Sequence, residues 1–357
     1  MVRLVSELDF GGLEKVVELA SLELIQRDDV ELWVLVLSKG GTTSDFLSSQ
    51  GINVIVLDQQ SRIPNFFLLF RLITLFKKLE PDILHTSGAE ANFHGLLAGF
   101  FVGIKVRLGE EIGFPNHHFL WEMLFKFTYS FSHKVIVISK AVQEFIVNKG
   151  EVPLGKTRII YNPVQAFDIP HTILKEEEFT FITVARLVPI KNIEGLLVAF
   201  SQVESNNKSL IIIGDGTSKK SLSQLVVSLG ISSTVQFLGF QDDVSQFLVQ
   251  ADCFVLSSFS EGSSVALAEA MMAELPSIVT KIGGASEILG DSDSGIEIDP
   301  YDAMSLKNAM EYMLALDHEE RREMGKRAGA YVISKFSPST HVDQLQALYS
   351  ELMNGQG

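Results

Sequence analysis

The chain has 357 residues, 46% hydrophobic and 20% charged, which suffices for two domains with cores of their own and excludes disordered, collagenous and coiled-coil proteins. The formal net charge of −15 is divided unevenly: residues 1–165 carry 16 basic and 18 acidic side chains, and residues 166–357 carry 13 and 26. Because this balance leaves no broad basic face, we expect no nucleic-acid partner.

Short apolar, β-branched segments alternate with helix-length segments along the whole chain. In the first half, the predicted strands are Val2–Ser6, Leu32–Leu37, Asn53–Leu57, Ile83–Thr86, Val106–Gly109, Lys134–Ile138 and Arg158–Tyr161. In the second half, they are Thr180–Ala185, Ser209–Ile213, Val235–Leu238, Cys253–Leu256, Ser277–Val279 and Ile296–Ile298. Strands that are apolar at nearly every residue indicate parallel sheets covered on both faces. We therefore predict an α/β fold of two doubly wound, Rossmann-like domains whose parallel sheets face a central cleft.

The predicted domains are residues 1–165 and residues 166–338, followed by a C-terminal helix over residues 339–357. Whether that helix packs back on the first domain is open. The joint between the domains, residues 162–178, carries two prolines and an acidic run. No window reaches the roughly 18 apolar residues of a membrane helix. The one cysteine, Cys253, lies in an apolar run, so we expect a buried thiol and a cytoplasmic, reducing setting.

The segment Ser258–Met272 is the most informative, because it follows a predicted buried strand and opens a helix. Ser263 or Ser264 is expected to cap this helix, whose first backbone N–H groups would form an anion site suited to a phosphate. Gly262 lets the backbone approach a ligand closely. Glu269 lies about 7–8 Å along the helix from that site, roughly the reach from a diphosphate to a ribose.

Glu261 precedes the same turn. The alternative for this pair is structural: Glu269 as a solvated helix residue and Glu261 as a partner of the helix dipole. A second loop favours ligand binding, because Arg186 and Lys191 follow a predicted strand and offer a planar fork and a point charge to a diphosphate. Surface ion pairing is the alternative for these two cations.

Glycine-rich turns follow three further predicted strands. They are Gly11-Gly12, Gly214-Asp215-Gly216 and Gly283-Gly284. The second lacks the third glycine of a dinucleotide fingerprint, so a dinucleotide oxidoreductase is not indicated. Asp291-Ser292-Asp293 has a spacing that metal-dependent transferases use, but it lies in a polar turn, and we expect no metal there.

Taken together, these residues resemble the family 4 glycosyltransferases, also described as glycosyl transferases group 1, which are retaining enzymes of the GT-B fold. The family's paired glutamates, with seven residues between them, match Glu261 and Glu269, and its Arg-Leu loop with a downstream lysine matches Arg186, Leu187 and Lys191. Further matches, in order, are Gly11-Gly12-Leu13-Glu14, Pro81–His85, Tyr161-Asn162-Pro163, Gly214-Asp215-Gly216, Phe237-Leu238-Gly239, and Gly283-Gly284 with Glu287.

The resemblance implies a nucleotide-diphosphate sugar as substrate, no cofactor and no metal. It makes residues 1–165 the acceptor-side domain and residues 166–338 the domain that binds the nucleotide sugar. Arg186 and Lys191 would neutralise the leaving diphosphate, Glu269 would hold the ribose, and Glu261 would bind hydroxyls of the donor sugar. The remaining donor-binding residues that it implies are Gly12, Gly214, Gly216, Gly262, Ser263, Ser264 and Val265. Electrostatic stabilisation of a leaving group is often the largest single contribution to the rate enhancement of an enzyme.

The acceptor side departs from the family pattern. His85 matches the family's strand histidine, but Ser87 stands where many relatives have a second one. The group that assists the acceptor hydroxyl is left open between Glu111, Glu110 and His117. His85 has the alternative of a core histidine.

Two helices crowded with Phe and Leu, Phe66–Lys78 and His118–Ser132, also carry basic residues. Packing in the core and contact with an anionic membrane are both open for them. The predicted function is sugar transfer from a UDP or GDP sugar to a glycan or lipid-linked acceptor with retention, in cell-surface polysaccharide synthesis. The alternatives are a nucleotide-sugar 2-epimerase of the same fold and a non-catalytic nucleotide-sugar-binding protein.

Overall fold

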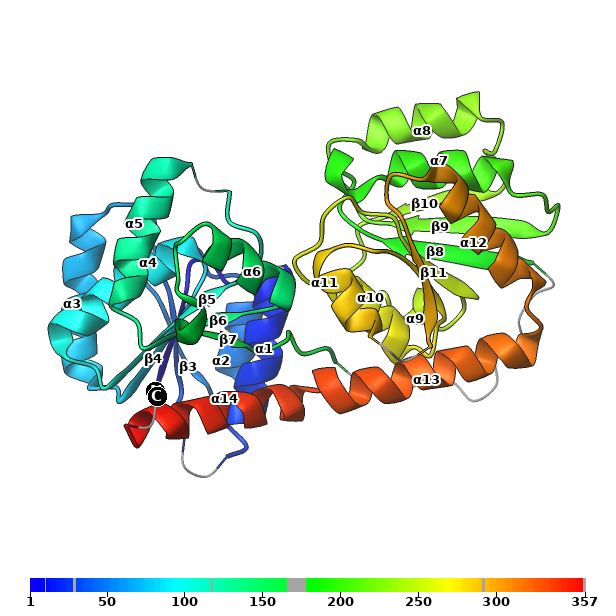
Figure 1. Cartoon of the computed structure of the whole chain (residues 1–357). Helices are drawn as coiled ribbons and strands as arrows, with labels where there is room; N and C mark the ends of the chain where they lie inside the picture. Colours follow the sequence, from blue (N-terminus) through cyan, green and yellow to red (C-terminus); the bar gives the residue numbers. More distant parts are fainter. Residues whose placement is uncertain (10, 28–29, 117, 166–177, 291–292, 356–357) are drawn as a thin grey trace. The chain divides into compact units, whose positions relative to one another are not determined.

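The computed structural model describes every residue except 10, 28–29, 117, 166–177, 291–292 and 356–357. The described residues form two compact units, each with one parallel sheet covered by helices (Figure 1). Unit 1 contains Met1–Pro163 and Pro338–Gly357, and unit 2 contains Val164–Ser337. Most of the predicted joint lies outside the described residues. The C-terminal helix belongs to unit 1.

Unit 1 is built on a seven-stranded parallel sheet with the order β3-β2-β1-β4-β5-β6-β7. Its strands are β1 (Val2–Val5), β2 (Trp33–Val36), β3 (Asn53–Val56), β4 (Ile83–Ser87), β5 (Val106–Glu111), β6 (Lys134–Val137) and β7 (Thr157–Ile159). One face packs against α3 (Phe66–Leu79), α4 (Ala89–Val102), α5 (Phe119–Ser130) and α6 (Lys140–Asn148). The other packs against α1 (Gly12–Leu24), α2 (Thr42–Ser49) and α14 (Pro338–Met353).

Unit 2 repeats the design with six parallel strands in the order β10-β9-β8-β11-β12-β13. The strands are β8 (Phe179–Val184), β9 (Lys208–Ile213), β10 (Val235–Gly239), β11 (Cys253–Leu256), β12 (Ser277–Thr280) and β13 (Gly295–Ile298). The helices are α7 (Ile193–Gln202), α8 (Lys219–Ser228), α9 (Ser245–Leu248), α10 (Val265–Met272), α11 (Gly283–Leu289), α12 (Ala303–Ala315) and α13 (His318–Phe336). The predicted α/β class with two parallel-sheet, Rossmann-like domains is confirmed.

Every predicted strand is present, with its ends within two residues of the prediction. The difference that matters is β5, because we expected Glu110 and Glu111 to lie in a loop and both belong to the strand. Successive side chains of a strand point to opposite faces of the sheet. Glu110 therefore faces the layer of α1 and α14, whereas Glu111 faces the layer of α4 and α5.

A buried ion pair joins β1 to β5 in unit 1. Arg3 and Glu110 are almost fully buried, and the Arg3 guanidinium lies 3.0 Å from the Glu110 carboxylate. Burial alone would raise the pKa of Glu110, but Arg3, the neighbouring His85 and a hydrogen bond from Ser87 hold that pKa far below its usual range. Removing either partner would leave a buried charge unpaired, so the pair fixes the positions of β1, β4 and β5 relative to one another.

The C-terminal helix α14 covers this ion pair through polar contacts of its own. The Tyr349 hydroxyl lies 2.8 Å from His85 Nδ1, and His341 Nδ1 lies 2.8 Å from the Tyr161 carbonyl oxygen, to which it donates. Leu345 and Leu348 pack beside them in the same layer. No helix among the described residues combines the length and the hydropathy that crossing a membrane requires.

His341 makes the stability of unit 1 depend on pH. Its burial lowers the pKa of the imidazole to about 4, against 6.5 for an unhindered histidine. Between pH 6.5 and 4 the unfolded chain takes up a proton at this side chain and the folded chain does not. As the pH decreases from 6.5 to 4, the free energy of unfolding therefore decreases, and His341 contributes on the order of 3 kcal/mol to that decrease.

We expect His341→Asn, which keeps a donor for the Tyr161 carbonyl, to remove this part of the pH dependence. The measurement is denaturant unfolding of the full chain between pH 7.5 and 4, followed by the fluorescence of Trp33 and Trp121, both of which lie in unit 1. His318→Asn, at an exposed position, is the control and should follow the parent. Identical slopes for parent and His341→Asn would contradict the assignment.

Candidate functional site

The carboxyl end of the unit 2 sheet brings Lys191 and Glu261 together. Lys191 ends the loop after β8, and Glu261 lies in the loop after β11, the neighbouring strand. Their side chains form an ion pair in which Lys191 Nζ donates to Glu261 Oε1, and both are largely buried, with 17% and 6% of the side chain exposed. The sequence prediction that these two residues belong to one site is consistent with this placement.

The same loops are locked together by further hydrogen bonds. The Ser258 hydroxyl donates to Glu261 Oε1 at 2.8 Å, and the Ser257 hydroxyl donates to the Lys191 carbonyl at 3.0 Å. The Gly284 N–H, in the turn after β12, donates to the Glu261 carbonyl at 2.9 Å. Glu261 Oε2 has no hydrogen bond to another described residue, so that oxygen can accept one from a ligand hydroxyl.

The glycine turn after β9 packs against the loop after β8. A Cβ on Gly214 would lie 1.9 Å from the Ala185 carbonyl oxygen, and one on Gly216 would lie 2.4 Å from that of Leu187. Both glycines have positive φ, of 132° and 159°. Only glycine permits this backbone contact, so the turn holds the Arg186–Lys191 loop in place.

The helix α10 begins beside Glu261, as the sequence predicts. Its N-cap is Ser264, whose hydroxyl accepts from the Leu267 N–H at 3.2 Å. The cap uses the third N–H group of the helix and leaves those of Val265 and Ala266 without an intrahelical acceptor. With Gly262 and Ser263 in the preceding turn, these donors suit an anion.

The remaining predicted donor residues differ in their surroundings. Arg186 is exposed, and its guanidinium makes no ion pair with another residue in the described part of the chain. Glu269 is the fifth residue of α10, is half-buried, and has interactions of its own. Gly12 lies in unit 1, at the exposed first residue of α1, so it belongs to a different part of the chain from the other donor residues.

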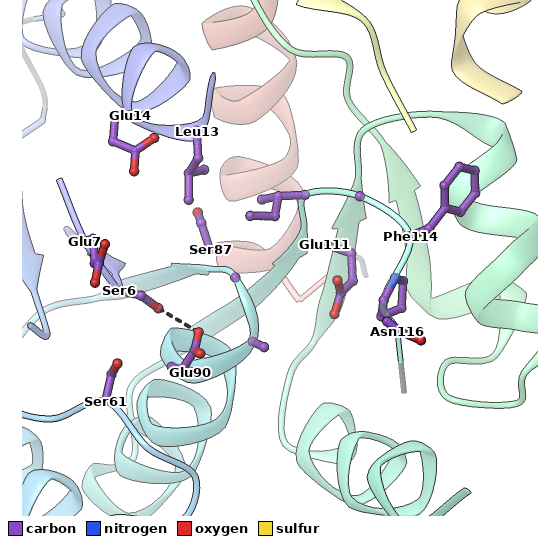
Figure 2. A pocket seen from close by; sticks show the side chains of 15 residues that line it. Ser6, Glu7, Leu13, Glu14, Ser61, Ser87, Glu90, Glu111, Phe114 and Asn116 are labelled. Carbon is purple, nitrogen blue, oxygen red and sulfur yellow. Dashed lines mark hydrogen bonds between the residues drawn. The ribbon is translucent and has the colours of Figure 1, made fainter. Parts of the chain in front are cut away.

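Unit 1 has a cavity of about 480 Å³ at the carboxyl ends of β1, β4 and β5 (Figure 2). Among the described residues that line it are four acids, Glu7, Glu14, Glu90 and Glu111, and no lysine or arginine. Burial raises the pKa of Glu14, and the charges of Glu7 and Asp9 add to the increase. The lining therefore suits a ligand that offers hydroxyl groups and disfavours one that brings a negative charge.

Among the acceptor-side candidates that the structure describes, Glu111 alone is placed at this cavity. In Figure 2 it lies on the same side of the pocket as Phe114 and Asn116. The Tyr129 hydroxyl donates to Glu111 Oε1, and the Asn92 side-chain amide donates to the Tyr129 oxygen at 3.1 Å. The Tyr129 phenol has a pKa well above its usual value, because it is buried beside the Glu111 charge.

The other described acceptor-side candidates, Glu110 and His85, do not line the cavity. Glu110 is held by Arg3 on the opposite face of β5. His85 is fully buried, with Nε2 3.2 Å from Glu110, and burial lowers the pKa of its imidazole. This is the surrounding expected of a core histidine. His117 lies outside the described residues, as do Asp291 and Ser292.

Sequence reasoning missed the residues that hold the site together. In the sequence, Ser258 is only the first residue of the predicted ligand-binding segment, Ser257 lies just before it, and Tyr129 is one of many aromatic residues in a predicted helix. A charged residue within an apolar strand, such as Arg3, is a signal that calls for a buried partner. No group of three or more His, Cys, Asp or Glu side chains in the described ranges is arranged to hold a metal ion.

Two family models together span most of the chain. The model described as Glycosyltransferase Family 4 matches residues 10–166, and the model described as Glycosyl transferases group 1 matches residues 165–330. The boundary between the two matches falls close to the boundary between the units.

Curated relatives point the same way. The chain is 29% identical over 181 residues to N-acetyl-alpha-D-glucosaminyl L-malate synthase of Bacillus anthracis, covering 50% of the chain and 47% of that protein. It is 24% identical over 369 residues to the UDP-Gal:alpha-D-GlcNAc-diphosphoundecaprenol alpha-1,3-galactosyltransferase of Escherichia coli, covering 96% and 94%. The chain thus spans about half the length of the first relative and nearly all of the second.

Solved structures share the fold. HepE from Anabaena, solved in complex with UDP, has a TM-score of 0.82 at 21% identity and covers 98% of this chain and 100% of its own. A glycosyltransferase from Rickettsia africae has a TM-score of 0.85 at 18% identity, covering 99% and 98%. At these identities the likeness concerns the fold. The two family models, together with this fold and the paired-glutamate site, show that the chain belongs to the family 4 glycosyltransferases of the GT-B fold.

Proposed function

We propose that this glycosyltransferase moves a hexose from a UDP sugar to a glycan or lipid-linked acceptor, with retention of the anomeric configuration and without a divalent metal. Unit 2 binds the donor, and the acidic cavity of unit 1 binds the acceptor. The ion pair of Lys191 with Glu261, in the loop before the start of α10, carries this assignment.

The unit 2 site has the groups that a departing nucleoside diphosphate requires. Glu261 holds the Lys191 ammonium and Ser257 holds the Lys191 backbone carbonyl, so the cation is positioned before a ligand arrives. Arg186 adds a planar pair of donors that is free to turn toward a phosphate. The first amides of α10 add uncharged donors. Such fixed donors stabilise the charge that develops on the leaving group, and they act locally even though unit 2 is acidic overall.

The two glutamates are assigned to the sugar and the ribose. Glu261 Oε2 is available to a hydroxyl of the donor sugar, since Oε1 already accepts from Lys191 and Ser258. Glu269, further along α10, is assigned to the ribose hydroxyls. Glu111 in unit 1 is assigned to the acceptor hydroxyl, with Tyr129 as its positioning residue.

The choice of UDP and of the acceptor class is supported by the relatives. HepE was solved with UDP and with UDP-glucose, and the Escherichia coli relative is named for a UDP-galactose donor and a diphosphoundecaprenol-linked acceptor. Lipopolysaccharide core and extracellular polysaccharide are the settings that we propose for this chain as well. A lipopolysaccharide core glycosyltransferase of Rhizobium meliloti is 29% identical over 171 residues.

The donor assignment predicts that Arg186→Ala weakens binding of UDP-glucose by about tenfold to a hundredfold, because one charge-assisted contact to the diphosphate is lost. Arg186 is exposed and makes no ion pair among the described residues, so the fold should be unaffected. Calorimetric titration with UDP-glucose, UDP-galactose and GDP-mannose measures the effect. Arg322→Ala on α13 is the matched control, with 54% of its side chain exposed. Equal affinities for parent and Arg186→Ala would contradict the assignment.

The acceptor assignment predicts that Glu111→Gln lowers transfer by about a hundredfold or more, because a positioned general base is removed. Donor binding should remain that of the parent, since Glu111 lies in unit 1. Transfer of radiolabelled sugar from the UDP donor into lipid-linked and glycan fractions is the readout. Glu144→Gln, with 62% of the side chain exposed, serves as the control. Transfer that persists at the parent rate would exclude Glu111 from this role.

Retention and metal independence are tested on the same reaction. We expect the product to keep the α configuration of the donor, as seen in the anomeric coupling by NMR, and the rate to be unchanged by EDTA. Inversion of the anomeric configuration would contradict retention. Loss of activity with EDTA that Mg²⁺ or Mn²⁺ restores would contradict metal independence. Conversion of the UDP sugar to its 2-epimer would identify the epimerase instead, and binding without turnover would identify a sugar-binding protein.

A further inference from the structure

The outer side of α3 is apolar although it faces solvent. Its inner side buries Leu68, Leu72 and Phe76 in the core of unit 1. The opposite side exposes two phenylalanines at the start of the helix and one a turn later, each to about two thirds: Phe66 67%, Phe67 67% and Phe70 66%. Large apolar side chains that are grouped and exposed to this extent mark an interaction site.

The apolar surface continues over the two neighbouring helices. α3 packs on α4, and α4 packs on α5, on the same side of the sheet (Figure 1). The exposed side chains are Phe100 48%, Phe101 63%, Phe119 69%, Leu120 69%, Met123 57% and Phe127 56%. The ring of Phe131 lies 4.7 Å from that of Phe100 and 4.9 Å from that of Phe127, which joins the surfaces of α4 and α5. We call the exposed apolar side chains of α3, α4 and α5 the aromatic face.

The aromatic face carries positive charge within an acidic protein. α3 contains Arg71, Lys77 and Lys78 and no acidic residue, and its three basic side chains are exposed. Lys126 is exposed on α5, whose only acid, Glu122, is paired with Lys149 at 2.6 Å. The chain as a whole has a net charge of −15, so this concentration of cations on one helix favours an anionic partner.

A groove on this face has the chemistry of a lipid site. A cavity of about 490 Å³ lies between β3 and α3, with walls formed by Ile55, Leu57, Phe67, Phe70 and Leu75. Arg71 and Lys78 also line it, and the Arg71 guanidinium is held there by a hydrogen bond to the Leu57 carbonyl at 2.9 Å. Apolar walls with cations beside them fit an acyl chain whose headgroup bears a phosphate.

We propose that the aromatic face docks on a membrane that contains anionic phospholipid. The phenylalanines of α3 and α5 enter the boundary between headgroups and acyl chains, and Arg71, Lys77 and Lys78 bind lipid phosphates. Of the two sequence-based alternatives for these helices, core packing accounts for their inner sides and membrane contact for their outer sides. The inference does not rest on the proposed transfer reaction, because none of the side chains of the aromatic face is assigned to the donor or the acceptor.

The test is sedimentation of the full chain with vesicles of phosphatidylcholine alone or with about 30 mol% phosphatidylglycerol. We expect the parent to bind the anionic vesicles at least about tenfold more tightly, with the preference weakened by salt. Phe66→Ser/Phe67→Ser/Phe70→Ser should lose binding to both vesicles, and Lys77→Gln/Lys78→Gln should lose about tenfold on the anionic vesicles only. The controls are Phe240→Ser, 64% exposed in unit 2, and Lys39→Gln, 73% exposed in unit 1.

Calorimetric titration with UDP-glucose and the thermal unfolding midpoint show that each variant is folded. Three results would overturn the proposal: no sedimentation of the parent with either vesicle, parent-like binding by the triple Phe variant, or an equal loss in Phe240→Ser. A face that mediates self-association instead would appear as a dimer in sedimentation velocity, abolished by the triple Phe variant, with no vesicle binding. Failure of vesicle binding with UDP-glucose binding intact would overturn only the membrane inference.

Discussion

Both candidate sites depend on the parallel arrangement of the strands in the two sheets. Because neighbouring parallel strands end at the same edge of a sheet, loops that are far apart in sequence meet there. Lys191 and Glu261 are 70 residues apart in the chain, yet they form one ion pair at the ends of β8 and β11. The acidic cavity of unit 1 arises in the same way at the ends of β1, β4 and β5. The strand order of each sheet therefore determines which loop residues meet at its candidate site.

The interior of unit 1 adds a second constraint. Arg3 and Glu110 are buried together, which is stable only while the pair and its hydrogen bonds are intact. The pair faces α14, so the last helix of the chain completes the domain that the first strand begins. By holding β5 in register, it also fixes Glu111, the next residue, on the opposite face toward the cavity. A structural charge and a candidate catalytic charge thus occupy adjacent positions of one strand.

Much of the fold could be predicted from the sequence, because fully apolar strands separated by helical segments admit few other arrangements. The start of α10, with its cap at Ser263 or Ser264, could be predicted from the motif. The shared site of Lys191 and Glu261 could be predicted from their loops at strand ends and from the family resemblance. What could not be predicted depends on side-chain direction. The end of β5, two residues later than expected, decides that Glu110 is structural and Glu111 lines a cavity. Likewise, the partner of Arg3 and the split of α3 into a buried and an exposed side require three-dimensional contacts.

The central claim is that the edge of unit 2 around Lys191, Glu261 and the start of α10 binds a nucleotide-diphosphate sugar. Amide hydrogen exchange of the full chain, with and without saturating UDP-glucose, tests it most directly because it locates the ligand. We expect amide exchange to slow in residues 186–191 and 257–266 when UDP-glucose is bound, and to stay unchanged in the helices of the aromatic face. Slowed exchange confined to other segments while UDP-glucose is bound would contradict it.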